Sequence, residues 1–262
     1  MNRITDYTKL ADDITNWIRD YATTNNIKSL VVGVSGGIDS AVISTLCART
    51  GLETHCMILP IYNNTEHTSI ALAHCQWLHD HHENIKWGLN HCGEAAIGYI
   101  EGAILDMNPH TLANTKSRLR MTILYAIAGS VQGIVVGTGN KVEDFGVGFF
   151  TKYGDGGVDI SPIADLYKTE VRELGRYLGI SQEILDAAPT DGLWTDGRTD
   201  EDQIGATYEE LEWAMEHREL GPVWWSYTPR QLHVLKEIYD KLHKQNQHKM
   251  LPIPIYKLNN GQ

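Results

Sequence analysis

The stretch VVGVSGGIDS at residues 31–40 combines an apolar run, a turn of small residues and the start of a predicted helix. The apolar run, which begins at residue 29, predicts a strand buried on both faces. Glycines let the backbone approach an anion closely, and amides at a helix N-terminus point at phosphate oxygens. Ser35 and Ser40 add hydroxyl donors, and Asp39 offers a hard oxygen that suits Mg²⁺. We therefore predict a phosphate-binding loop here, against the alternative of an ordinary strand–helix turn.

Outward from this stretch, short apolar runs alternate with helical patterns. Strands are predicted at 29–34, 55–61, 84–88 and 133–137, and helices at 4–24, 39–50, 66–82, 94–105, 111–131, 168–178, 208–219 and 229–244. In the first helix, apolar residues 10, 14, 17, 18 and 21 are expected on one buried face. This alternation predicts an α/β fold with a doubly wound parallel sheet and flanking helices, as a single domain over 1–262.

Two stretches resist regular structure, at 144–158 and 189–203. The first holds five glycines together with Phe145, Phe149, Phe150 and Tyr153, and the second is rich in Gly, Thr and Asp. Long irregular loops in a compact domain are usually functional, so we expect both to be mobile loops near a site.

Composition narrows the class of protein. The chain has 262 residues, 42% hydrophobic and 21% charged, which excludes a disordered or collagen-like protein. Its net charge of −11 argues against a nucleic-acid partner, and no apolar run is long enough for a membrane span. Four cysteines without a C-x-x-C pair and a polar N-terminus predict reduced thiols and a cytoplasmic location.

The motif SGGIDS resembles the pyrophosphate loop, here residues 33–40, of the N-type ATP pyrophosphatases. The segments that follow are similar to the NAD synthetase family within that superfamily: RLRM at 118–121, GTGNKVE at 137–143, GFFTKYGDGGVDI at 148–160, PIADLYK at 162–168, and His248-Lys249. The resemblance implies an adenine nucleotide alpha hydrolase-like fold. It also implies a ligase that converts deamido-NAD, ammonia and ATP to NAD, AMP and pyrophosphate through an acyl-adenylate, the last step of NAD biosynthesis.

Carried over motif by motif, the resemblance implies a set of site residues. ATP contacts are implied for Gly33, Val34, Ser35, Gly36, Gly37, Ile38, Asp39, Ser40, Thr138, Lys168 and Thr190. Deamido-NAD contacts are implied for Arg118, Lys152, Asp159, His248 and Lys249. Asp39 and Glu143 correspond to the Mg²⁺ ligands, and Lys168 to a catalytic, phosphate-binding lysine. From the residues alone, Arg118 reads as a solvated helix charge and His248-Lys249 as a basic tail.

Asp155, between two glycines, is a candidate for binding or deprotonating ammonium, although a turn aspartate is the common alternative. The pyrophosphate loop begins only 34 residues into the chain, so we expect no N-terminal glutaminase domain and hence use of free ammonia. A separate glutaminase partner is left open. The resemblance further implies a homodimer.

Three other interpretations compete. One is another ATP-pyrophosphatase ligase, such as a tRNA-modifying enzyme, which the acidic charge disfavours. Another is a nucleotide-binding regulatory protein without catalysis, which would be expected to lack Asp39, Glu143 or Lys168. The third concerns the histidines and cysteines at 74–92, whose spacing matches no common zinc pattern and is more simply explained as a polar helix end.

Overall fold

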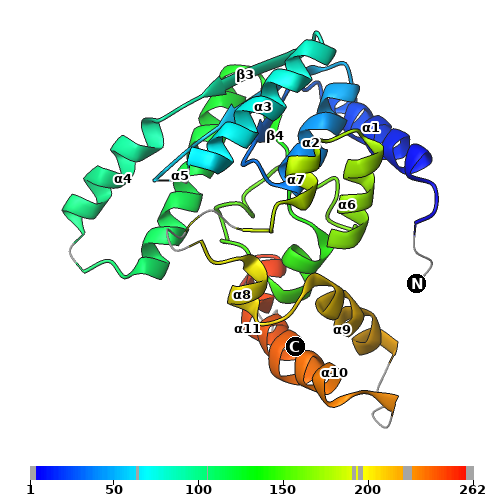
Figure 1. The fold of residues 1–262 in the computed structure, drawn as a ribbon. Helices are drawn as coiled ribbons and strands as arrows, with labels where there is room; N and C mark the ends of the chain where they lie inside the picture. The colour runs from blue at the N-terminus through cyan, green and yellow to red at the C-terminus, as the bar shows by residue number, and fades with distance from the viewer. Residues whose placement is uncertain are drawn as a thin grey trace, which may run out of the picture.

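Four parallel strands in the order β3-β2-β1-β4 form the centre of the molecule in this computed structural model (Figure 1). The structure describes residues 4–62, 65–104, 106–190, 193, 197–220 and 226–257. The strands are β1 (Ser29–Gly33), β2 (Glu53–Ile58), β3 (Ile85–Leu89) and β4 (Gly133–Val135). The chain runs outward from β1 to β3 and then returns to the other side of β1 as β4. The carboxyl ends of β1 and β4 are therefore a topological switch point, where open α/β sheets bind ligands.

Helices cover both faces of the sheet, which explains why the central strand β1 is almost continuously apolar and buried. On one face lie α1 (Tyr7–Thr24), α2 (Ile38–Arg49), α3 (Thr65–His81), α6 (Lys168–Tyr177) and α7 (Gln182–Asp186). Leu30 and Val32 of β1 point into this layer. Val31, between them, points to the other face, against α5 (Pro109–Ser130). The predicted parallel α/β sheet with flanking helices is confirmed.

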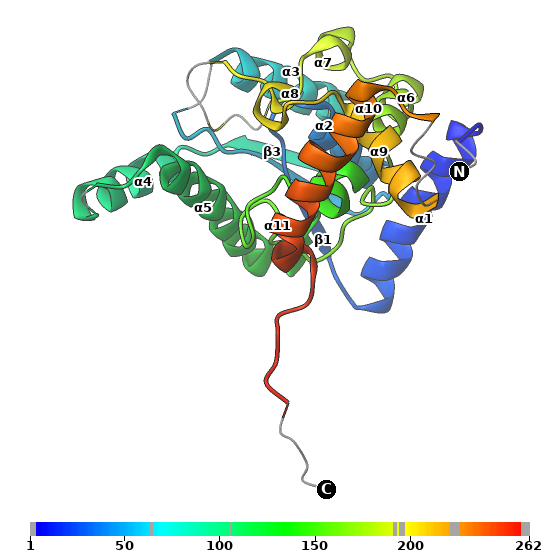
Figure 2. The same cartoon turned by 90° about the horizontal axis from the view of Figure 1, so that it is seen from below.

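A second helical group packs beside the sheet, at the bottom of Figure 1. It consists of η1 (Val142–Val147), α8 (Asp200–Ile204), α9 (Tyr208–Leu220), α10 (Pro229–His233), η3 (Val234–Tyr239) and α11 (Asp240–Met250). Tyr208 and Tyr239 are fully buried in its core. At the left of Figures 1 and 2, α4 (Cys92–Ala103) and α5 extend from the body as an arm, and residues 251–257 run away from the body as an exposed tail (Figure 2).

The buried face predicted for the first helix was partly wrong. Ile14 and Ile18 are buried as expected, but Trp17 and Tyr21 are 48% and 37% exposed. The buried stripe of α1 instead consists of Ala11, Ile14, Thr15, Ile18 and Ala22. Ala11 and Ala22 are small, and such residues let a helix lie close to its neighbours, here α2 and α6. Size, rather than hydrophobicity alone, decided which side faces inward.

The predicted loops contain more regular structure than expected. Residues 142–147, which overlap the start of the 144–158 stretch, form the π-helical turn η1. The 189–203 stretch ends in α8, and its residues 191, 192 and 194–196 lie outside the described residues. Strand β2 spans Glu53–Ile58 instead of the predicted 55–61. It ends before Pro60, because proline has no N–H to donate to the neighbouring strand. In the described part of the chain, no helix is long and apolar enough to cross a bilayer.

Candidate active site

The SGGIDS turn is closed by its own hydroxyl groups. Ser40 Oγ donates to the Gly37 carbonyl at 3.0 Å and lies 3.1 Å from Ser35 Oγ, which in turn accepts from the Gly37 amide at 3.2 Å. Gly36 has φ +90°, and a Cβ there would lie 2.6 Å from the His67 carbonyl oxygen of α3. Glycine is required at this position by both conformation and space. The turn thus has a fixed shape at the start of α2.

Beside this turn lies a buried cluster of one cation and two carboxylates. Lys168 Nζ is 2.5 Å from Asp39 Oδ2 and 2.9 Å from Glu143 Oε1. The three side chains are only 3%, 17% and 16% exposed, respectively. Asn140 Nδ2 donates to Asp39 Oδ1 at 3.2 Å, and the Tyr208 hydroxyl donates to Glu143 Oε1 at 2.5 Å. These residues, distant in sequence, form one hydrogen-bonded unit.

Topology explains how these residues meet. Asp39 lies in the first turn of α2, directly after β1 and the small-residue turn. Glu143 lies in η1, which follows β4, the neighbour of β1 in the sheet. Lys168 is the first residue of α6. The cluster therefore occupies the switch point between β1 and β4, which the strand order alone marks as a ligand site.

Burial and pairing shift the pKa values of this cluster. Burial alone would lower the pKa of Lys168, but the two carboxylates outweigh it and hold the pKa above its ordinary value. Burial would likewise raise the pKa of Glu143, but Lys168 and the Tyr208 hydroxyl keep it below its usual range. For the neighbouring Asp144, the described residues provide no ion-pair partner. Burial and the charge of Glu143 raise its pKa to about 8.

The residues expected to contact deamido-NAD gather around the loop at 148–159. Arg118 Nε of α5 donates to the Lys152 carbonyl at 3.3 Å, and Lys152 Nζ donates to the His248 carbonyl at 2.8 Å. Lys249 Nζ donates to the carbonyls of Gly148 and Phe150 at 2.7 and 2.8 Å. Four predicted positions from three separate segments thus meet at one loop. Lys249 also has a role that its sequence did not suggest, because it holds the loop backbone.

The predicted ammonia residue lies in the same loop. Asp155 Oδ1 accepts from Ser117 Oγ at 2.7 Å and from the Thr151 amide at 3.0 Å. A Cβ on Gly154 would collide with the Ser117 side chain, so glycine is needed there for the close approach to α5. Asp155 itself remains exposed. Asp159 accepts from the Tyr125 hydroxyl at 3.1 Å and from the Val135 amide at 2.8 Å, which ties the loop to α5 and β4.

The two threonines predicted to contact ATP lie on other segments. Thr138 lies two residues before Asn140, in the segment that leaves β4. Thr190 Oγ1 donates to the Arg198 carbonyl at 3.4 Å.

Several residues of the site were missed by sequence reasoning. They are Asn114, Lys116, Ser117, Asn140, Asp144 and Tyr208. Asn140 and Asp144 are inside or next to the GTGNKVE motif, and Ser117 and Lys116 precede RLRM, so their motifs were the available signal. Tyr208 begins α9 and carries no local signal.

The histidines and cysteines at 74–92 form no metal site in the described part of the chain, where no group of three or more potential ligands occurs. His74 is instead a buried core residue whose Nε2 lies 2.9 Å from Ser44 Oγ. Burial lowers its pKa to about 4, so this imidazole is neutral at physiological pH. The expected polar helix end does not describe His74, which lies within α3 and packs in the core.

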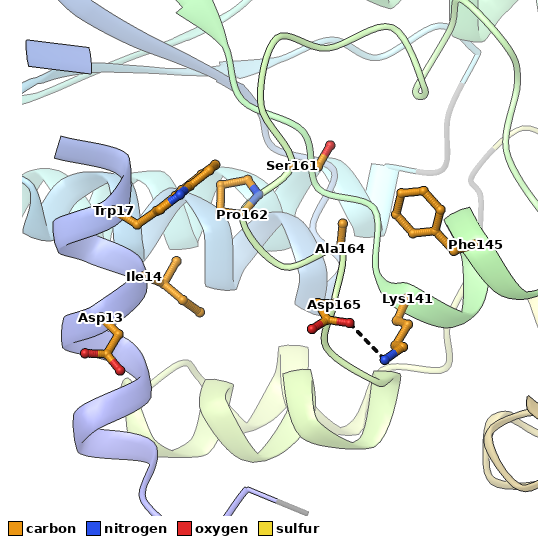
Figure 3. Close-up of a pocket in the computed structure, with 9 residues that line it drawn as sticks. All are labelled: Asp13, Ile14, Trp17, Lys141, Phe145, Ser161, Pro162, Ala164 and Asp165. Atoms are coloured by element: carbon orange, nitrogen blue, oxygen red, sulfur yellow. Dashed lines mark ion pairs between the residues drawn. The ribbon is translucent and has the colours of Figure 1, made fainter. Parts of the chain in front are cut away.

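A surface cavity of about 550 Å³ lies between α1 and the segments 141–145 and 161–165 (Figure 3). Its walls are Ile14, Trp17, Phe145, Pro162 and Ala164, with the Lys141–Asp165 ion pair at its edge. None of the predicted site residues lines it. The buried charge cluster, rather than this cavity, marks the chemistry.

Comparison with known proteins agrees with this geometry. The family model described as NAD synthase matches residues 10–252. The NH(3)-dependent NAD(+) synthetase of Alkaliphilus metalliredigens is 39% identical over 253 residues, covering 91% of this chain and 94% of the relative. That of Carboxydothermus hydrogenoformans is 40% identical over 210 residues, covering 77% and 82%. The solved structure of NMN synthetase from Francisella tularensis superposes with a TM-score of 0.83 at 32% identity, covering 97% of this chain and all of that one. A chain with this match, and with Asp39, Glu143 and Lys168 gathered at the switch point, belongs to the NAD synthase family.

Proposed function

We propose that this protein is an ammonia-dependent NAD synthetase, which converts deamido-NAD, ammonia and ATP to NAD, AMP and pyrophosphate. The observation that carries the proposal is the Asp39–Lys168–Glu143 cluster beside the SGGIDS turn, within a chain of the NAD synthase family. Curated relatives at 39–40% identity are NH(3)-dependent NAD(+) synthetases, and they match across most of their own length. Neither a tRNA-modifying ligase nor a regulatory protein without catalysis is favoured by any of these observations.

The chemistry requires activation of the nicotinate carboxylate, because oxide cannot leave from it. Transfer of AMP to the carboxylate produces an acyl-adenylate with a good leaving group and releases pyrophosphate. The turn at 33–40 positions the triphosphate through its amides and hydroxyls, and Lys168 neutralises phosphate charge. In the ligand-free arrangement the Lys168 ammonium is held by Asp39 and Glu143, so it is already in place beside the turn. The protein contributes mainly position and charge.

Two carboxylates next to a phosphate-binding turn form a donor set that fits Mg²⁺, which prefers few carboxylates together with phosphate oxygens. Asp39 and Glu143 would hold the ion, and Asn140 orients Asp39 from the opposite oxygen. A bound Mg²⁺ supplies charge neutralisation at the phosphates and at the departing pyrophosphate. The Lys168 ammonium bridges the same two carboxylates in the structure, and it would be available to phosphate oxygens if Asp39 and Glu143 held the ion.

Ammonia then attacks the activated carbonyl and displaces AMP. The nucleophile is neutral ammonia, so a proton must leave ammonium before or during attack. Asp155 is the carboxylate we assign to this step, because Ser117 and Thr151 fix one of its oxygens while the residue remains exposed. Asp155→Asn should lower activity mainly at limiting ammonium. An unchanged ammonium dependence would remove Asp155 from this role.

The acceptor is bound, in this proposal, by Arg118, Lys152, Asp159, His248 and Lys249. Their convergence on the 148–159 loop supports a shared site. The structural neighbour from Francisella tularensis favours a second acceptor, because it is an NMN synthetase with a TM-score of 0.83. On that alternative, the same adenylation and amidation would act on nicotinate mononucleotide.

The deciding experiment is product formation with ATP, Mg²⁺ and either deamido-NAD or nicotinate mononucleotide, each with ammonium or with glutamine. We expect NAD from deamido-NAD and ammonium, with one AMP per NAD, and a much lower rate with the mononucleotide. A higher kcat/KM for the mononucleotide would establish the second candidate instead. Amidation with glutamine alone would contradict ammonia dependence, and a separate glutaminase would then be sought as the donor.

We propose that the chain is a homodimer, with the α4–α5 arm at the interface. Of the 22 residues of α5, only Ala113, Lys116, Ser117 and Ala128 are buried in one chain. Tyr99 and Ile104 near the end of α4 are 82% and 54% exposed. Burying such apolar side chains favours association. Mass measurement at micromolar protein concentration should give two chains, and the mass of one chain would contradict the proposal.

We also propose a cytoplasmic location. Cys47, Cys56 and Cys75 are buried free thiols and Cys92 is an exposed one, as expected in a reducing compartment. Fractionation of the source cells, with the protein followed by antibody, would test this.

A further inference from the structure

Lys116, in the N-terminal half of α5, is a buried cation without a counter-charge in contact. The residue is 5% exposed. Among the described residues, its ammonium contacts the Leu193 carbonyl oxygen at 3.5 Å and the face of the Tyr62 ring at 5.4 Å. Among the described residues no carboxylate forms an ion pair with it, although Glu101 attracts it from farther away. A buried, unpaired charge is strongly unfavourable, so the free protein keeps Lys116 at a cost in stability.

The neighbours of Lys116 increase this cost. Arg120 lies one turn further along α5 and donates from Nε to the Leu59 carbonyl at 3.0 Å. Like charges four residues apart on a helix repel each other. Burial and Arg120 both lower the pKa of Lys116. An anion bound between α5 and the segments of Tyr62 and Leu193 would offset both the unpaired burial of Lys116 and its repulsion by Arg120.

The direction of the α5 face that carries Lys116 indicates which anion would bind there. Residues 116, 120 and 124 are spaced by four, so they share one side of α5. At one end of this line, a Cβ built on Gly33 would lie 3.2 Å from Leu124 Cδ1, so Leu124 lies on the start of the pyrophosphate loop. Because α5 leads into the first residue of the parallel strand β4, its N-terminal half lies beyond the carboxyl ends of the strands. The line therefore runs from the pyrophosphate loop outward over the site.

The loops that contact Lys116 support the same assignment. Tyr62 follows β2, the strand next to β1, and Leu193 belongs to the 189–203 stretch that contains Thr190, a proposed ATP contact. The residues proposed for the acceptor, Arg118 and Lys152, meet instead at the 148–159 loop. Lys116 is thus on the nucleotide side of α5.

We infer that Lys116 is a further substrate-binding residue, whose ammonium pairs with a phosphate of bound ATP across the site from Lys168. The inference rests on the proposed function for the identity of the nucleotide, but its test does not depend on the acceptor. Lys168 neutralises charge from the side of Asp39 and Glu143, and Lys116 neutralises it from the side of α5. Catalysis would use both cations as negative charge moves to the departing pyrophosphate.

The test compares Lys116→Met, which keeps the stem and removes the charge, with Lys116→Arg, which keeps the charge. Lys28→Met is the matched control. Lys28 is exposed and immediately precedes β1, so it lies at the amino ends of the strands, away from the site at their carboxyl ends. The probe is the Mg²⁺ complex of α,β-methylene-ATP, measured by calorimetry. We expect binding about 10- to 100-fold weaker for Lys116→Met, as for loss of one charged hydrogen bond. The other two variants should stay within a few-fold of the unmodified protein.

A second readout separates ligand binding from a structural role. Without ligand, Lys116→Met should melt at or above the temperature of the unmodified protein, because an unpaired buried charge is gone. A lower melting temperature with unchanged nucleotide affinity would overturn the inference. So would unchanged affinity together with a raised KM for deamido-NAD, which would move Lys116 to the acceptor. If the unmodified protein binds the analogue but makes no NAD, the proposed function fails while the comparison of affinities still decides the role of Lys116.

Discussion

Two buried lysines of this molecule, Lys168 and Lys116, have opposite environments. Lys168 is 3% exposed and is held by two carboxylates within 2.9 Å, so its charge is stabilised in the free protein. Lys116 is 5% exposed and has a carbonyl and an aromatic face instead. The first arrangement is complete without ligand, and the second is not. A buried base that has no carboxylate partner in the described part of the chain points to a ligand that supplies the partner.

The largest effect should come from removing the paired cation. Lys168→Met leaves Asp39 and Glu143 buried without their counter-charge, and we expect a loss of about 3–5 kcal/mol in the free energy of unfolding. Activity should fall about 10²–10³-fold, because phosphate charge is no longer neutralised. Urea denaturation and the rate of NAD formation measure the two effects.

Lys9→Met is the control for breaking an ion pair as such, because Lys9 and Asp13 are both exposed. Lys9→Met should change neither the free energy of unfolding nor the rate of NAD formation measurably. If Lys168→Met were as stable as the unmodified protein, the contrast between the two buried lysines would be wrong.

A buried base without a charge partner should also appear in the pH dependence of stability. His74 has a folded pKa of about 4, below the ordinary value of 6.5, because burial disfavours the charged imidazolium. The unfolded chain therefore binds more protons between these two pH values, and stability falls as pH drops through that window. The loss is about 3 kcal/mol by pH 4.

The measurement is thermal denaturation from pH 7.5 to 4, for the unmodified protein and for His74→Gln. The variant should show a flatter profile in this range. His110→Gln is the control, because His110 is exposed and its removal should leave the slope unchanged. An equally steep profile for His74→Gln would assign the acid sensitivity to other groups.

The hydroxyl of Tyr208 sharpens the description of the paired cluster. It donates to Glu143 at 2.5 Å, and the Tyr208 ring lies 4.8 Å from the Lys168 ammonium. Tyr208→Phe keeps the ring and removes a hydrogen bond to a charged group, so we expect a loss of about 1.5–3 kcal/mol in unfolding free energy. Tyr99→Phe, at an 82% exposed position, should have no effect. Equal stabilities of the two variants would show that Lys168 alone satisfies Glu143.

The smallest effect concerns a third lysine, which is partnered by carbonyls. Lys249 is half-buried, and burial lowers its pKa. Lys249→Met should lose about 1 kcal/mol of stability, because its two carbonyl hydrogen bonds are partly screened by solvent. KM for deamido-NAD should rise, since the 148–159 loop loses two of its hydrogen bonds to α11, while nucleotide affinity stays unchanged. A change confined to nucleotide affinity would place Lys249 with Lys116 instead.

Much of the fold and part of the site could be predicted from the sequence. Strands were predicted close to all four observed positions. Apolar runs mark β1 and β4, because a parallel strand buried on both faces has few polar residues, whereas β2 and β3 contain polar residues such as Glu53 and Lys86. The glycine–serine motif indicated a tight turn, and the structure agrees: Gly36 has φ +90°, which only glycine adopts without strain. The motifs SGGIDS, GTGNKVE and PIADLYK pointed to Asp39, Glu143 and Lys168, the three charged residues that form the buried cluster. Tyr208 could not be predicted, because nothing near it in the chain distinguishes a core tyrosine from one that donates to a buried carboxylate.

The sequence by itself thus determined the family, the parallel sheet and the identity of the charged residues near the nucleotide turn. Only the tertiary structure decided which of those charges have partners. The reason is physical: burial and ion pairing depend on distances of a few ångström between segments far apart in the chain. Lys168 and Lys116 are the same residue type, each on a helix beside one sheet. Strand order places two carboxylates against the first and leaves the second facing the place of the ligand.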